Sequence, residues 1–120
     1  MGIQSDIGNV GRSAVISNPD DYTSINAYVL VALLDCLHAS SVAISITNVD
    51  LANSIDWEVL TGNTDTITEA ISLKATAVVA PAGWGTYTSS TIAYRYVGVY
   101  VRSTVGGAAG IARIYAMAKS

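Results

Sequence analysis

The sequence predicts an all-β protein, a single antiparallel β-sandwich of the jelly-roll or Greek-key type with six to eight strands. Three observations support this fold class. Short segments alternate between apolar and polar residues, turn residues separate them roughly every 8–14 positions, and no convincing amphipathic helix interrupts the series. The 120 residues fit one domain, which we divide into an N-terminal arm at residues 1–12 and the β-sandwich at residues 13–120.

The arm and the first strand come first in chain order. Residues 1–12 contain three glycines and little hydrophobic pattern. They form either a disordered tail or an extended segment that reaches onto a neighbouring subunit. A short strand is predicted at residues 13–17, because Asn18 and Pro19 directly after it are a turn signal.

The segment at residues 24–40 is ambiguous, because apolar residues lie on both of its faces. The aspartates at positions 20–21 could stand near a helix start, which favours a buried helix. Tyr28, Val29 and Val31 are β-formers, which favours a strand. We predict a long strand that is buried on both sides.

The middle and last thirds supply the remaining strands. Residues 41–50 and 54–63 alternate clearly between apolar and polar side chains. A weaker strand containing Ile67, Ile71 and Leu73 follows. The Pro/Gly-rich segment at residues 80–86 is then predicted as a loop, and residues 94–118 as a closing β-hairpin.

The hairpin has one apolar face and one unusual face. Val97, Val99 and Val101 are predicted to point inward, together with the alternate residues of the second strand. Arg95 falls on the valine face by parity, and we place it at the solvated end of the strand. The opposite face is predicted to gather six side chains: Tyr94, Tyr96, Tyr100, Arg102, Arg113 and Tyr115. Since Tyr and Arg are enriched in protein–protein contacts, this face is the predicted interface, with ordinary cross-strand aromatic pairing as the alternative.

The composition also favours association. Apolar residues make up 51% of the chain and charged residues 12%, about half the usual charged share. Either small polar residues cover the surface or part of it is hidden against other subunits. The net charge of −3 and the scattering of only six Lys and Arg residues argue against a nucleic-acid partner.

The sequence contains neither a signal-peptide pattern nor an apolar run long enough to span a membrane. Residues 27–34 form its longest apolar run. Cys36 is the single cysteine, which excludes an internal disulfide. We therefore expect synthesis in a cytoplasm and no membrane partner.

The sequence predicts no catalytic residue, no metal, no cofactor and no enzyme. His38 is the only histidine, so a multi-histidine metal site or a catalytic triad lacks its parts. Cys36 and His38 would share a strand face, but two ligands do not make a zinc site, and we predict a buried thiol beside a strand-end histidine. Asp56 and Glu58, two residues apart, could resemble a glycosidase pair or form a solvated face.

Two aromatic residues suggest another function. Trp84 and Tyr87 could stack on sugar rings, as in carbohydrate-binding modules built on the same sandwich. Alternatively, Trp84 is a loop residue that folds over the end of the core.

The strand sequences "SVAISITNVD", "SIDWEVLTGN" and "YRYVGVYV", followed by the terminal hairpin, carry a resemblance. Over residues 41–118 the chain resembles small β-sandwich decoration and minor capsid proteins of tailed phages. This resemblance implies a non-enzymatic, often trimeric protein that binds an assembled capsid lattice and has no catalytic residues.

The predicted function is therefore that of a self-associating structural protein within a larger assembly, most plausibly a capsid decoration or minor capsid protein located in the virion. Its partners would be other copies of itself, with a trimer favoured, and a major capsid protein lattice. One alternative is an extracellular filament or tube subunit joined by strand exchange. A second alternative is a carbohydrate-binding module.

Overall fold

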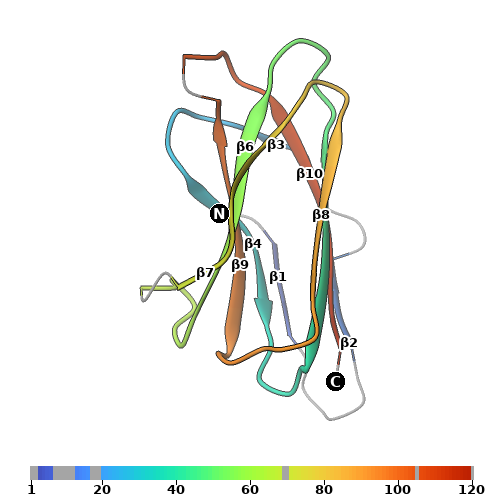
Figure 1. Ribbon diagram of the computed structural model, residues 1–120, viewed down its shortest axis with the longest axis vertical. Helices are drawn as coiled ribbons and strands as arrows, with labels where there is room; N and C mark the ends of the chain where they lie inside the picture. Colours follow the sequence, from blue (N-terminus) through green and yellow to red (C-terminus); the bar gives the residue numbers. More distant parts are fainter. Residues whose placement is uncertain (1–2, 7–12, 17–19, 69–70, 105, 120) are drawn as a thin grey trace.

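The computed structural model describes residues 3–6, 13–16, 20–68, 71–104 and 106–119. These residues form two β-sheets that stand face to face with their strands along the long axis of the molecule (Figure 1). In spatial order, sheet A consists of β1 (Ile3–Asp6), β4 (Val29–Asp35), β9 (Tyr96–Ser103), β6 (Ile55–Gly62) and β7 (Ile71–Val79). Sheet B consists of β2 (Ser13–Ile16), β10 (Ile111–Lys119), β5 (Ser41–Asn48) and β8 (Trp84–Ser89), with β3 (Tyr22–Thr23) also paired to β10.

The connections follow the jelly-roll pattern. From β3 to β10 the chain changes sheet at every step except between β6 and β7, and these eight strands pair antiparallel within their sheets. The predicted fold class is therefore confirmed. The described residues contain ten strands rather than six to eight, because β2 and β3 share one edge of β10 and β1 adds a strand to β4. The pairing of β1 with β4 is parallel.

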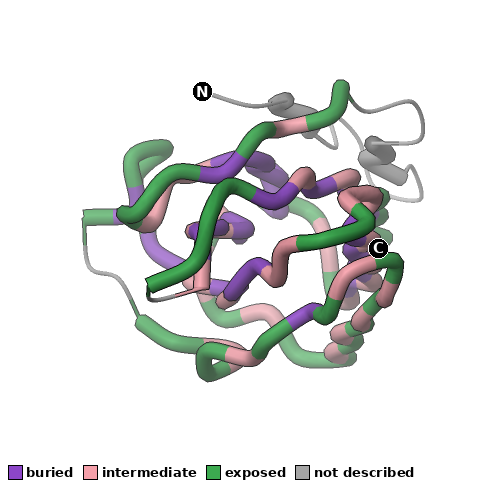
Figure 2. Tube along the Cα trace, turned by 90° about the horizontal axis from the view of Figure 1, so that it is seen from above, coloured by how far each residue is buried: buried purple, intermediate pink, exposed green. Residues whose placement is uncertain are grey.

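The core lies between the sheets, and Figure 2 shows its buried segments in the middle of the molecule. Trp57 of sheet A is the largest fully buried side chain, and it reaches across to sheet B. A Cβ added at Gly85 in β8 would lie 3.2 Å from Cζ2 of Trp57, so the glycine makes room for the indole. The ammonium group of Lys74 lies 4.5 Å from the centre of the same ring.

Strand β4 is buried on both sides, which confirms the predicted strand and excludes a helix there. Its inner face packs in the sandwich core. On the outer face of sheet A, Leu30 and Ile67 pack over Gly98, where an added Cβ would lie 2.7 Å from Cδ1 of Leu30 and 2.6 Å from Cδ1 of Ile67. The prediction that Ile67 belongs to a strand is wrong. It lies in the β6–β7 connection with a φ of 51°, a left-handed conformation that β-branched residues rarely adopt.

Asn48, at the end of β5, joins the two sheets at one end of the sandwich. It is fully buried. Its Nδ2 donates to the carbonyl oxygens of Asn53, at 2.7 Å, and Val79, at 3.2 Å. Its Oδ1 accepts from the backbone N–H groups of Asp50, at 3.1 Å, and Ile111, at 3.4 Å. One carboxamide thereby ties β5 and β10 of sheet B to β7 of sheet A.

Among the described residues, no helix is long and apolar enough to cross a membrane.

The substitution Asn48→Asp should lower the free energy of unfolding by about 3 kcal/mol at neutral pH, because a carboxylate would face two carbonyl oxygens without a proton to donate. Urea unfolding measures this loss. Asn53→Asp is the matched control, since the Asn53 amide makes a single exposed bond to the carbonyl of Ala109. Equal losses in the two variants would contradict the role assigned to Asn48.

Candidate assembly surfaces

The prediction of a β-hairpin at residues 94–118 is wrong. β9 pairs with β4 and β6 in sheet A, whereas β10 pairs with β2, β3 and β5 in sheet B. β9 and β10 therefore lie in opposite sheets. Gly110, directly before β10, is held by Ser24, whose Oγ accepts from the Gly110 N–H at 2.8 Å. The alternation was assigned correctly, because Val97, Val99 and Val101 are buried. Two strands that face each other across a core show the same alternation of apolar and polar residues as two strands that pair within one sheet.

The six predicted interface residues consequently do not share one face. Tyr96, Tyr100 and Arg102 lie on the outer face of sheet A, opposite in parity to the buried valines of β9. Arg113 and Tyr115 lie on the outer face of sheet B. Tyr94 precedes β9 and lines a hollow of about 220 Å³ at the end of the sandwich. The single surface predicted from the sequence is therefore corrected to two opposite faces and one end.

On the outer face of sheet A, the guanidinium group of Arg102 is held by other residues of the same chain. Nε of Arg102 donates to Oδ2 of the buried Asp56 at 3.0 Å, and Oγ1 of Thr104 donates to Oδ1 at 3.0 Å. The guanidinium also stacks 4.4 Å from the ring centre of Tyr28, whose hydroxyl pKa is raised by burial. Asp56 is therefore a buried, ion-paired group, and the alternative that it belongs to a solvated face is wrong.

At one end of the sandwich, Arg95 forms a bidentate ion pair with Asp35. Its Nε and Nη2 donate to the two carboxylate oxygens at 2.9 and 2.7 Å, and the Asp35 side chain is only 6% exposed. Arg95 departs from the valine parity because it stands before β9 begins. The guanidinium holds the pKa of Asp35 below its usual value.

Cys36 and His38 lie in the turn after β4, so the expectation that they share a strand face is wrong. Cys36 is buried, and this burial, with the adjacent Asp35 carboxylate, raises its pKa to about 12. His38 is exposed. The thiol is therefore a core group with little thiolate at neutral pH.

The outer face of sheet B has a distinct relief. The outward side chains of β10 are long, and we name them the ridge: Arg113, Tyr115, Met117 and Lys119. Those of the neighbouring β5 are short, and we name them the trough: Ser41, Ala43, Ser45 and Thr47. β8 borders the trough on its other side with Trp84, Thr86 and Thr88. Met117 and the trough were not predicted to belong to an interface, because small residues at every second position of a strand are also typical of an ordinary solvated face.

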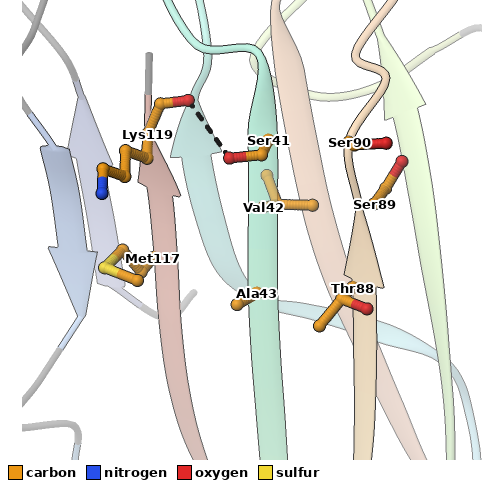
Figure 3. A pocket seen from close by; sticks show the side chains of 8 residues that line it. All are labelled: Ser41, Val42, Ala43, Thr88, Ser89, Ser90, Met117 and Lys119. Atoms are coloured by element: carbon orange, nitrogen blue, oxygen red, sulfur yellow. Dashed lines mark hydrogen bonds between the residues drawn. The ribbon is translucent and has the colours of Figure 1, made fainter.

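Figure 3 shows one end of this relief, where Met117 and Lys119 stand on one side of Ala43 and Thr88 stands on the other. The hollow between them measures about 430 Å³. Tyr115 and Met117 are 42% and 41% exposed, so large apolar surface faces solvent. At the other end of the ridge, Arg113 forms a bidentate ion pair with Asp21 at 2.7 and 2.9 Å.

Trp84 and Tyr87 lie on opposite faces of β8, because they are three residues apart in a strand. Trp84 points outward and is 74% exposed, whereas Tyr87 packs against the core. The predicted loop position of Trp84 is wrong, as is the alternative that it folds over the core. The two rings do not form one platform for a sugar.

Within the described ranges, no three His, Cys, Asp or Glu side chains are grouped so that they could hold a metal ion. The connection between β5 and β6, at residues 49–54, uses the Asp50 carboxylate for turn formation. Oδ2 of Asp50 accepts from the N–H groups of Ala52, at 3.0 Å, and Asn53, at 2.6 Å.

No protein-family model and no curated protein matches this chain. Among solved structures, the chain is similar to a chain of the disulfide-linked pili that form Bacillus endospore appendages. That likeness has a TM-score of 0.55 and 18% identity, and it covers 91% of this chain and 83% of that chain. Aeromonas hydrophila PliG, a periplasmic inhibitor of g-type lysozyme, is also similar, with a TM-score of 0.45, 10% identity and coverage of 96% and 94%. At these identities the likeness concerns the fold alone.

The ion pair of Asp35 gives a prediction about pH. Because its pKa is lowered in the folded state, its contribution to stability is present above the usual aspartate pKa of 3.8 and is lost as the pH falls through the lowered value. Asp35→Asn should cost about 1–2 kcal/mol at pH 7, and the difference from the native chain should shrink in acid. Urea unfolding at pH 7 and pH 3 measures both.

Asp21→Asn is the control, since the Asp21–Arg113 pair is exposed on both sides and should contribute much less. A loss for Asp35→Asn that is the same at both pH values would contradict the assignment.

Proposed function

We propose that this chain is a non-enzymatic structural subunit that self-associates into an extracellular filament or tube through exchanged β-strands. The observation that carries the proposal is the position of β1. This four-residue strand, part of the predicted arm, lies on the edge of sheet A and runs parallel to β4.

Such a strand can pass from one copy to the next at little cost. Strand addition is held by backbone hydrogen bonds, and these are the same whether β1 pairs with its own β4 or with that of a neighbour. Six residues, 7–12, separate β1 from β2. Fully extended, six residues span about 20 Å, which is comparable to the 22 Å short dimension of the molecule.

The far edges of both sheets also suit assembly by strands. Among the described residues, β7 and β8 each pair with a strand of their own sheet on one side only. Natural proteins commonly protect such edges with charges or prolines. β8 contains neither, and β7 contains one charged residue, Lys74, whose side chain lies over Trp57.

The fold likeness to a pilus subunit supports the filament over the virion. A difference between the two proteins concerns their covalent links. The appendages of the similar structure are disulfide-linked, whereas this chain has one cysteine and Cys36 is buried. The contacts between copies of this chain would therefore be non-covalent.

The competing interpretation is the capsid decoration protein predicted from the sequence, as a trimer on a major capsid protein lattice. The similar structure from the endospore appendages is a pilus and not a capsid protein. The carbohydrate-binding alternative loses its basis, because Trp84 and Tyr87 face opposite directions.

Electron microscopy of the purified full-length chain tests this function. We expect filaments or tubes, and we expect deletion of residues 1–12 to abolish them while thermal unfolding still shows a cooperative transition. Deletion removes the strand that would be exchanged. Filaments that persist after the deletion, or a native chain that stays monomeric at micromolar concentration, would count against the proposal.

A further inference from the structure

We propose that the outer face of sheet B is a two-fold contact surface for a second copy of this chain, in which the ridge of each copy lies in the trough of the other. This inference deepens the proposed function, because it adds a contact between copies that does not use β1.

The rows of long and short side chains on the outer face of sheet B suggest that a second copy of the same face can fit against it. Ridge and trough are adjacent rows in register, with Met117 beside Ala43 and Tyr115 beside Ser45. Long side chains in one row and short ones in the next leave a step along the whole strand pair. The apolar side chain of Met117 borders the hollow of about 430 Å³ above Ala43. Without a second copy, water would fill this hollow.

The ridge and trough of one copy fit the trough and ridge of a second copy under one symmetry operation. A two-fold axis parallel to the strands, placed above the line between β5 and β10, brings β10 of one copy over β5 of the other. The rotation keeps each residue at its level along the strand. Met117 of the second copy therefore lies above Ala43, and Tyr115 of the second copy lies above Ser45. Both copies make identical contacts, as a closed two-fold interface requires.

The size and chemistry of the face meet the needs of a dimer. The strands of sheet B together contain 29 residues, which at about 3.4 Å along each strand and about 4.8 Å between strands cover about 470 Å² per copy. Two such faces bury about 950 Å², close to the lower limit of about 1,000 Å² for a specific interface. The charged residues Arg113 and Lys119 stand at opposite ends of the ridge, and Tyr115 and Met117 stand between them. This order gives an apolar centre and a polar rim.

A cysteine pair tests the geometry directly in the full-length chain. Ala43→Cys and Met117→Cys are prepared as separate variants, mixed and mildly oxidised. We expect a disulfide-linked heterodimer on denaturing electrophoresis from the mixture, at least tenfold more than from either variant alone. Residues 43 and 117 of different copies face each other, whereas each residue is one strand away from its own symmetry mate. Cys36 adds little background because it is buried.

The absence of that cross-link, or equal cross-linking in the unmixed samples, would overturn the proposal. So would a polysaccharide that binds the unlinked chain and is lost in Trp84→Ala, because the face would then hold a glycan. If filaments form without the cross-link, the face contact is wrong and the proposed function stands. If the cross-link forms without filaments, the face contact stands and the proposed function is wrong.

A matched pair of arginine substitutions gives a second measurement. Ser45→Arg fills the floor of the trough and should weaken dimerisation at least tenfold in analytical ultracentrifugation. Thr66→Arg introduces the same side chain at an exposed position in the β6–β7 connection, away from sheet B, and should leave dimerisation unchanged. Equal effects of the two variants would contradict the assignment of the contact to sheet B.

Discussion

The buried carboxamide of Asn48 is the interaction on which the sandwich depends at one end. Most consecutive strands of a jelly roll lie in different sheets. The backbone hydrogen bonds between the strands of one sheet therefore do not connect it to the other sheet. Asn48 lies in sheet B, accepts from the first residue of β10 and donates to the last residue of β7 in sheet A. Trp57 makes the corresponding apolar link, because its indole reaches from sheet A to Gly85 in sheet B. These two links leave the outer faces of both sheets available for other contacts.

The sequence predicts the strands and their inward faces, because the period-two alternation of β5, β6, β9 and β10 reports burial directly. It does not report which sheet a strand joins. Val97 and Ile114 face the same core from opposite sides, and the pattern is the same as in a hairpin. For this reason the six predicted interface residues do not share one face, although each of them except Tyr94 lies on an outer strand face. The position of Ile67 was predicted wrongly, because Ile67 packs into the space above Gly98, a residue far away in the sequence.

The three arginines of the described residues show how the low charge content is used. Arg95, Arg102 and Arg113 each pair with an aspartate of a different strand or loop: Asp35, Asp56 and Asp21. The pairs formed by Arg95 and Arg102 engage two buried aspartates of sheet A. On the outer face of sheet B, Arg113 and Lys119 stand at the two ends of the ridge, with Tyr115 and Met117 between them. In the proposed assembly this face is one contact between copies, and β1 at the edge of sheet A is another.

The central claim is that copies of this chain are joined through β1. A cryo-electron microscopy reconstruction of the assembled full-length chain tests it most directly, because the path of residues 1–12 can be followed between subunits. The account predicts that Ile3–Asp6 of one copy lies parallel to β4 of its neighbour, with the register seen within the single chain. A reconstruction in which every β1 pairs with its own β4, and no strand passes between copies, would contradict it.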